Sequence, residues 1–243
     1  MSSTGQRRPG AGGRSARAGR IKPQPRAQAT RQAILTAAAE HFARNGYHAT
    51  SLDSVLADSG GTKGALYFHF ASKDALARAV IAEMLQGWGT LRGRVSARGL
   101  DPLSTLLALV DEVIARLLDD PIARGGTRLL NDLPVPELAR VHYDFGEQDT
   151  LELLTQAAQA GLLREGIDPA LVAPQIVAVI AGNRQICDAL GERENLWQRV
   201  GQAWTLLLPT IAVDSWLAAW RTSSPQTRQP PSHGDISGSE GTN

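Results

Sequence analysis

Apolar residues recur every three or four positions along most of the chain, which is the period of an amphipathic helix. The first such stretch predicts a helix over about 28–45, because Gly46 follows it directly and glycine commonly ends helices. The apolar face of this helix consists of Ile34, Leu35, Ala38 and Phe42. No alternating strand pattern stands out anywhere in the sequence. The pattern therefore predicts an all-α fold.

Capping residues place the starts of the later helices. A side-chain oxygen just ahead of an apolar stretch accepts a hydrogen bond from the first turn, and proline fits that turn well. Such starts occur at Thr50 or Ser51, Thr62, Ser72, Asp101–Pro102 and Asp168–Pro169. Helices are predicted over about 63–68, 137–160, 168–190 and 194–219, as well as after Ser51, Ser72 and Asp101.

The charge of the chain is divided unequally. Residues 1–39 contain eight lysines and arginines and no acidic residue, so the remainder carries −7 although the whole chain is at +1. Residues 1–27 hold too little apolar surface to fold, so we expect a disordered basic arm there. Residues 222–243 are polar and rich in turn residues, which predicts a disordered tail. A cationic arm on an acidic body indicates an anionic partner.

Several classes of protein are excluded at this level. No run of 18 apolar residues occurs and the first residues lack an apolar signal core, so we expect no membrane-spanning helix and a cytoplasmic protein. Cys187 is the single cysteine, which we expect to be a small buried residue. No metal-binding histidine spacing, phosphate loop or nucleophile motif is present. We therefore expect no enzyme activity, no metal and no cofactor.

Two short capped helices flank the turn formed by Ser59, Gly60 and Gly61. Short helices joined by a tight glycine turn cross steeply, as in the helix-turn-helix motif. In that motif the second helix enters the major groove of DNA while the first lies across the backbone. Residues 28–75 are therefore predicted to form a three-helix DNA-binding domain.

Side chains on and around the second short helix are the candidates for DNA contact. Gly64 and Ala65 are small enough for close approach to base edges, and Lys63 can donate to guanine. Backbone N–H groups at the caps and the polar side chains nearby suit phosphate oxygens. The predicted DNA-binding residues are Arg31, Ser51, Thr62, Lys63, Gly64, Ala65, Tyr67, His69 and Lys73. We expect Phe68 and Phe70 to be core residues.

The stretch Thr62–Phe70, read as TKGALYFHF and followed by SKDALA, resembles the DNA-binding domain of tetracycline-repressor (TetR) family regulators. The similarity covers residues 30–80 and is greatest to the γ-butyrolactone receptors and related pseudo-receptors of actinomycetes. It implies a homodimer on a pseudopalindromic DNA operator, with half-sites about 34–36 Å apart. It also implies a helical ligand-binding and dimerisation domain, here 76–221, in which the helices 168–190 and 194–219 pair across the dimer.

The resemblance also suggests where a small-molecule ligand binds. The candidate pocket residues are Met84, Trp88, Val110, Phe145, Ile180 and Asn183. Met84 and Phe145 stand where this branch has a polar residue and a tryptophan, so the ligand stays open between a butyrolactone, a furan and an antibiotic or its intermediate. For Asn183, a hydrogen bond between helices is the alternative to a ligand contact. Arg128 could pair with an acidic ligand, and a surface ion pair is the alternative.

Two tryptophans lie seven positions apart on the last predicted helix, Trp197 and Trp204, and are candidates for the dimer interface. The sequence thus predicts a ligand-responsive repressor that controls secondary metabolism. The alternatives are a TetR-like regulator of drug efflux and a regulator with no small-molecule ligand.

Overall fold

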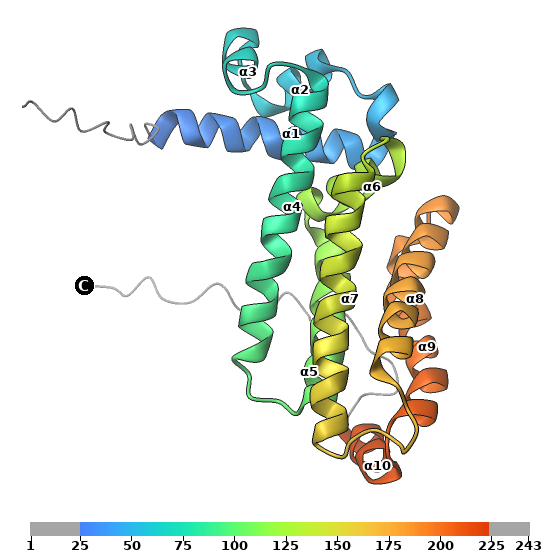
Figure 1. Cartoon of the computed structure of the whole chain (residues 1–243). Helices are drawn as coiled ribbons and strands as arrows, with labels where there is room; N and C mark the ends of the chain where they lie inside the picture. Colours follow the sequence, from blue (N-terminus) through green and yellow to red (C-terminus); the bar gives the residue numbers. More distant parts are fainter. Residues whose placement is uncertain (1–24, 224–243) are drawn as a thin grey trace, which may run out of the picture.

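The computed structural model describes residues 25–223 (Figure 1). Most of the predicted arm and tail lies outside this range. Residues 25–27 and 222–223 are helical, so the disorder predicted for these few positions is wrong. At the first of them the reason is local, because Pro25 opens the first helix and proline suits a first turn.

The described residues form an all-α structure, as predicted. In chain order the elements are α1 (Pro25–Ala49), α2 (Leu52–Ser59), α3 (Lys63–His69), α4 (Lys73–Ser96), α5 (Pro102–Asp119), α6 (Pro121–Asp132), α7 (Pro136–Gln159), α8 (Pro169–Leu190), the 3-10 turn η1 (Arg193–Asn195), α9 (Leu196–Ile211) and α10 (Asp214–Ser223). Within residues 25–223 the only β feature is an isolated bridge between Leu163 and Ala212.

The helices form two parts that share α1, α4 and α6 as their contact region. In Figure 1, α1 runs across one end of the molecule with α2 and α3 beyond it, while α4, α5, α7, α8 and α9 run along the long axis. The kink in α1 falls at Gly46, whose φ of 75° ends the regular helix where the sequence predicted. α4 continues through the predicted domain boundary at 75/76, so a single helix belongs to both parts.

α6 packs tightly against both α1 and α4. A Cβ on Gly125 would lie 2.5 Å from the carbonyl oxygen of Ala39 in α1, and one on Gly126 would lie 2.6 Å from Sδ of Met84 in α4. The sequence pattern predicted no helix here, because each glycine lowers helix stability by about 1 kcal/mol. Close packing of helix backbones compensates for that loss, and the two glycines allow it.

The last predicted helix, over 194–219, is interrupted in the structure. It consists of η1, α9 and α10, with Ala212 extended between α9 and α10. The extended segment pairs with the loop after α7, since the N–H of Arg164 donates to the Ile211 carbonyl at 2.8 Å. Proline at 209 weakens the end of α9, and the loop pairing replaces the helical hydrogen bonds lost there.

Candidate DNA-binding surface and ligand pocket

The turn between α2 and α3 is built from residues with separate local roles. Gly60 ends α2 in the left-handed region, with φ at 63°. Gly61 lies against Ile34 of α1, where a Cβ would come within 3.3 Å of Cγ1. Thr62 caps α3, since its Oγ1 accepts from the N–H of Ala65 at 3.2 Å. The sequence prediction of two capped helices around a glycine turn is confirmed.

α3 has one buried face and one exposed face. Leu66 and Phe70, four positions apart, are buried against α1 and hold the helix in place. Lys63 is exposed at the start of the helix, and Tyr67 is 49% exposed. Phe68 is 80% exposed, so the prediction that it is a core residue is wrong while that for Phe70 is confirmed. Because Leu66 and Phe70 fill the inner face, position 68 points outward.

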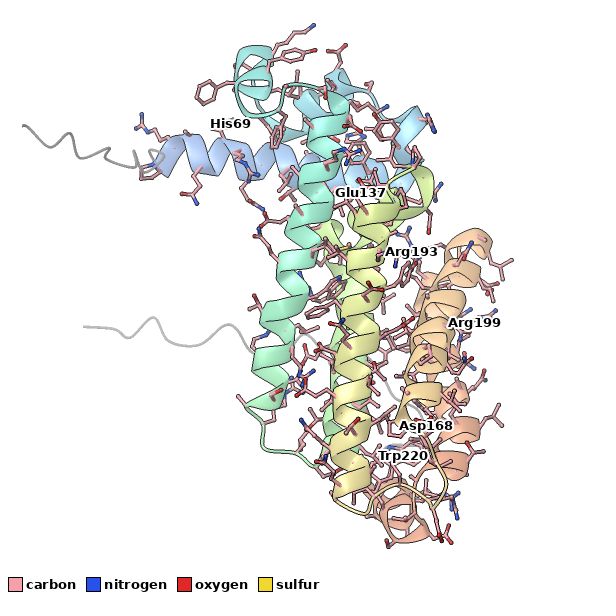
Figure 2. The ribbon with its side chains drawn as sticks, in the orientation of Figure 1. His69, Glu137, Asp168, Arg193, Arg199 and Trp220 are labelled. Carbon is pink, nitrogen blue, oxygen red and sulfur yellow. The ribbon has the colours of Figure 1, made fainter. Side chains whose placement is uncertain are left out.

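The other candidate DNA-binding residues on α2 and α3 differ in their exposure and in the contacts they make within the protein. Gly64 is exposed and nothing lies within 4 Å of the position of its Cβ, so the start of α3 presents a flat backbone surface. Ala65 is partly buried. His69, labelled in Figure 2, packs edge-on against the Phe68 ring at 5.0 Å. The Oγ of Ser51 is used as a cap, accepting from the α2 backbone at 3.0 Å.

The two flanking cations are already in contact with the protein. Nζ of Lys73 donates to the carbonyl of His48 at 3.2 Å and lies 4.5 Å from the centre of the Tyr47 ring. Burial lowers the pKa of Lys73 below its usual range. The guanidinium of Arg31 lies 5.4 Å from the centre of the Phe70 ring. These contacts orient both side chains beside α3, and their role toward DNA stays a prediction.

A cavity of about 120 Å³ lies between α4, α5, α7 and α8, and one residue of α6, Thr127, also lines it. Its wall is mainly apolar, with a few polar side chains. The lining residues are Trp88, Leu91, Leu106, Leu109, Val110, Val113, Leu117, Thr127, His142, Tyr143, Phe145, Gly146, Asp149, Thr150, Val177, Ile180, Ala181 and Arg184.

Four of the six candidate pocket residues, Trp88, Val110, Phe145 and Ile180, lie in this wall. Met84 does not, because it is fully buried against Gly126 of α6. Asn183 does not either, since its Nδ2 donates to the Val179 carbonyl at 2.8 Å within α8. This bond differs from both the ligand contact and the interhelical bond that the sequence suggested.

The pocket contains polar groups that have no partner. Nε1 of Trp88 and Nδ1 of His142 are buried without a hydrogen bond, and the two rings are 6.4 Å apart. Burial, together with the nearby charge of Arg184, lowers the pKa of His142 to about 4. His142 is therefore neutral near pH 7. The guanidinium of Arg116 lies 4.9 Å from the centre of the Trp88 ring.

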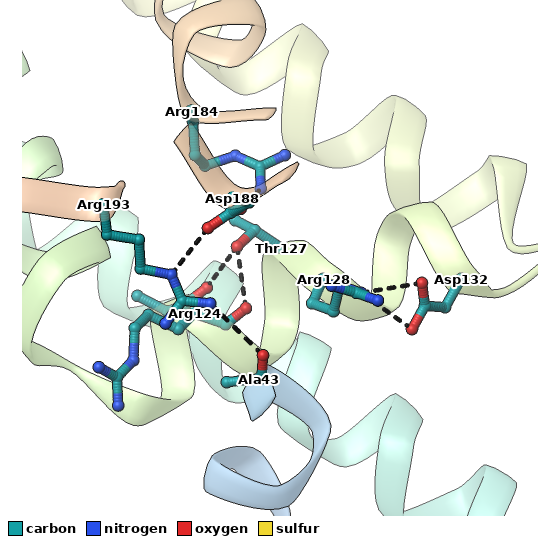
Figure 3. Close-up of polar contacts among 9 residues, drawn as sticks. Ala43, Arg124, Thr127, Arg128, Asp132, Arg184, Asp188 and Arg193 are labelled. Carbon is teal, nitrogen blue, oxygen red and sulfur yellow. Dashed lines mark hydrogen bonds and ion pairs between the residues drawn. The ribbon is translucent and has the colours of Figure 1, made fainter. Parts of the chain in front are cut away.

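Arg184 belongs to a polar chain that leads from the pocket toward α1 (Figure 3). It is 9% exposed and donates to Oδ2 of Asp188 at 2.8 Å. The other carboxylate oxygen of Asp188 accepts from Nε of Arg193 in η1, also at 2.8 Å. Nη2 of Arg193 lies 3.4 Å from the carbonyl oxygen of Ala43 in α1. One residue thus lines the cavity and joins a network that reaches the DNA-binding part.

A second polar link joins α6 to the end of α1. Arg128 pairs with Asp132 at 3.1 Å, which confirms the ion pair considered from the sequence. Oδ2 of Asp132 accepts the backbone N–H of Tyr47 at 2.8 Å, just after the kink at Gly46.

Cys187 is buried, as predicted, and burial raises the pKa of its thiol.

The candidate dimer residues occupy a different place from the one predicted. Trp197 and Trp204 are both buried, with Trp204 only 2% exposed. They therefore pack in the core of their own protomer and leave little surface for contact with a second protomer. Large apolar side chains instead remain exposed on α8 and α9. They are Leu171, Ile186, Leu190 and Leu206.

α8 is also apolar enough to be compared with a membrane span. It has 22 residues, a mean hydropathy of 1.3 in its most apolar window, and 22% of that window is buried in the protomer. By length and composition alone it passes the test for a membrane helix, which the stricter sequence criterion of an unbroken apolar run excluded. An exposed apolar helix face of this kind also occurs where two soluble chains pack together.

Comparison with known proteins agrees with this geometry. Residues 34–80, which span most of α1 through the first turns of α4, match the family model described as bacterial regulatory proteins, tetR family. The A-factor receptor protein of Streptomyces griseus is 33% identical over 191 residues, which are 78% of this chain and 66% of that protein, just under two thirds of its length. A solved structure of CprB from Streptomyces coelicolor with its operator is 30% identical, covers 81% of this chain and 95% of that chain, and has a TM-score of 0.70. The chain belongs to the TetR family.

Another solved structure shows which members of the family this chain resembles. A structure described as a γ-butyrolactone receptor (ArpA-like protein) is 28% identical, covers 82% of this chain and 95% of that chain, and has a TM-score of 0.68. The resemblance inferred from Thr62–Phe70 is thus confirmed. TetR-family proteins are transcription regulators, and this chain is related to the receptors among them.

Sequence reasoning missed the charged and polar groups of the TetR-family pocket, His142, Asp149 and Arg184. One signal was available for Arg184, because it is the only charged residue between Pro169 and Cys187. A lone cation in an apolar helix must find a partner or a ligand. No comparable signal marks His142 or Asp149, which lie among the polar residues of α7.

Proposed function

We propose that this TetR-family chain is a transcriptional repressor that binds a two-fold DNA operator as a homodimer and releases it when a small molecule occupies the pocket. The observation that carries the proposal is the exposed face of α3, where Lys63 and Tyr67 stand outward while Leu66 anchors the helix. A capped and anchored helix of this kind can place its first residues in the major groove. The protein then acts on DNA in the cytoplasm.

The exposed apolar residues of α8 and α9 support the homodimer. A soluble protein rarely leaves several large apolar side chains together on one pair of helices unless another surface covers them. A second copy of the same pair gives a self-complementary, two-fold interface. Such a dimer presents its two α3 helices to half-sites about one helical turn apart, roughly 34–36 Å.

α4 supports a route from ligand to DNA. Trp88 of α4 forms part of the pocket wall, and Ser72, which caps the same helix, lies two residues after Phe70, the C-cap of α3. A ligand that displaces α4 therefore moves α3, and a shift of a few ångströms in half-site spacing weakens operator binding without removing any base contact. The description of one relative as a γ-butyrolactone receptor makes butyrolactone-type signals the first candidates for the ligand. A related structure described as the basis for control of antibiotic production makes control of secondary metabolism the first candidate for the role.

A gel shift on the promoter of the protein's own gene tests DNA binding. Lys63→Ala is expected to weaken specific binding by about 1–3 kcal/mol if Lys63 reads a base. Arg94→Ala serves as the matched control, because Arg94 is an exposed cation at the far end of α4 with a single distant partner, Glu112 at 3.9 Å. The control should bind the promoter like the unsubstituted protein.

Two results would contradict parts of this proposal. Wild-type protein that binds its promoter no better than random DNA would remove the repressor assignment. An equal loss of affinity for promoter and random DNA in Lys63→Ala would make Lys63 a phosphate contact.

The same assay repeated with lactones, furans and antibiotics tests whether a ligand releases the protein from DNA. Failure of every compound to do so would favour a regulator without a small-molecule ligand.

A further inference from the structure

The polar end of the pocket adjoins a group of arginines that share a single carboxylate. Arg184 and Arg193 both donate to Asp188, each at 2.8 Å. Arg124, at the same junction of α6, α8 and η1, has a buried Nε without a partner, and its Nη1 donates to the uncharged Leu118 carbonyl at 3.1 Å. Two guanidinium groups therefore share the Asp188 carboxylate (Figure 3), and the third, that of Arg124, lies at the same junction without a carboxylate partner. Among the three, Arg184 is buried, with its side chain 10% exposed, and positive charge held away from water in this way favours binding of an anion.

The neighbouring polar groups of the cavity point to the same kind of ligand. Trp88 offers a buried N–H and His142 a buried ring nitrogen, and neither has a partner. An unpaired buried polar group costs about 1–3 kcal/mol, which a bound acceptor recovers. The indole N–H can only donate, so the ligand must present a hydrogen-bond acceptor on this side of the pocket.

The rest of the cavity limits the ligand further. The other charged group in the wall is Asp149, which already pairs with Arg92 at 2.6 Å and therefore needs no cation from the ligand. Most of the remaining wall is apolar, with Leu106, Val110 and Ile180 among its residues. The cavity thus combines one anion-binding end with an apolar body.

We propose that the ligand of this pocket is an amphipathic carboxylic acid, whose carboxylate binds Arg184 and whose aliphatic part lies against α5 and α8. The proposal rests on the proposed function, because it names the ligand class of that same pocket. A guanidinium can donate to both oxygens of a carboxylate, and Arg193 keeps Asp188 neutralised when Arg184 turns to the ligand. An uncharged lactone lacks this interaction.

A matched pair of probes tests the charge requirement. The full chain is titrated calorimetrically with 4-hydroxydodecanoate and with the γ-lactone that forms from it by loss of water, so the two probes differ only in the open carboxylate and hydroxyl. The acid is expected to bind at least about tenfold more tightly, and Arg184→Gln to remove that difference. Arg184→Lys keeps the positive charge, so this variant is expected to retain part of the preference for the acid over the lactone.

Arg164→Gln is the control variant. Arg164 is also an arginine in an ion pair, with Asp214, but it lies at the α10 end of the molecule and does not line the pocket. Its acid affinity should equal that of the unsubstituted protein. Should Arg184→Gln fail to fold, the acid and lactone affinities of the unsubstituted protein and of Arg184→Lys decide the question.

The carboxylic-acid proposal would be overturned if the lactone bound as tightly as the acid or more tightly. Dodecylamine, a cationic probe with an alkyl chain of the same length, is titrated in the same way, and tighter binding of it than of the acid would also overturn the proposal. So would the absence of binding by all three probes. So would an acid preference that survives in Arg184→Gln. Promoter binding is measured on the same preparation without ligand. A protein that binds its promoter but prefers the lactone refutes this inference alone, whereas loss of promoter binding refutes the repressor assignment and leaves the calorimetric result standing.

Discussion

His142 is the residue whose ionisation couples the pocket to protein stability. Its pKa is lowered to about 4 in the folded protein, against an ordinary value of 6.5. Between these values the unfolded chain binds the proton and the folded chain does not, so the free energy of unfolding falls as the pH falls. We expect it to be about 2 kcal/mol lower at pH 5 than at pH 7 from this residue alone. Urea unfolding at a fixed protein concentration measures the difference.

His142→Phe should reduce this pH dependence, because phenylalanine keeps a ring beside Trp88 and carries no proton. The variant and the unsubstituted protein are compared at both pH values. A decrease between pH 7 and pH 5 that is the same in both proteins would contradict the assigned role.

Single residues could be predicted from the sequence where local chemistry decides their position. The caps Ser51, Thr62 and Ser72 lie where expected, because a cap depends only on its own first turn. Phe68 and Arg184 could not be placed, since their surroundings come from other helices. An exposed phenylalanine and a buried arginine both run against average burial, and only tertiary packing determines such cases.

Among the helices, α6 makes the sharpest prediction through its glycines. A Cβ on Gly125 would overlap the backbone of Ala39, which cannot move aside without shifting α1. Gly125→Ala is therefore expected to destabilise the protein by about 1–3 kcal/mol. Gly89→Ala in α4 is the control, because nothing lies within 4 Å of that Cβ position, and it should stabilise by about 0.4–1 kcal/mol. Urea midpoints measured side by side give both values.

The same substitution should thus have opposite effects at the two sites. A Gly125→Ala protein as stable as the Gly89→Ala protein would show that α6 can withdraw from α1. We also expect Gly125→Ala to change operator affinity. Asp132, at the end of the same helix, accepts the backbone N–H of Tyr47 in α1, so a shift of α6 is passed to the DNA-binding part.

Elements with strong apolar periodicity were predictable, and elements defined by contacts were not. α5 and α8 begin at their predicted cap and proline, and α8 ends at Gly191. α6 was not predicted from the sequence, because its stability comes from packing against α1 and α4 rather than from its own residues. The break at Ala212 depends on pairing with the loop after α7, which no local pattern contains.

The whole molecule joins an exposed recognition helix at one end to an apolar helix pair along one side. The division of charge fits this arrangement, since residues 1–39 carry the positive excess and the rest of the chain is acidic. We therefore expect DNA to attract the positively charged N-terminal part of the chain and to repel the acidic remainder. Two recognition helices can act together only if the apolar pair holds two copies in a fixed relation.

Leu206→Glu tests that relation. Leu206 is 74% exposed on α9, so a charged residue there costs little in the protomer, yet it would be buried without a counter-charge in a dimer formed by α8 and α9. We expect the variant to be monomeric in sedimentation and to lose most of its operator affinity, because each half-site then binds alone. Leu100→Glu, an exposed leucine in the loop between α4 and α5, should stay dimeric. A dimeric Leu206→Glu protein would place the interface on another surface, and a monomeric variant with unchanged operator affinity would mean that operator binding does not require the dimer.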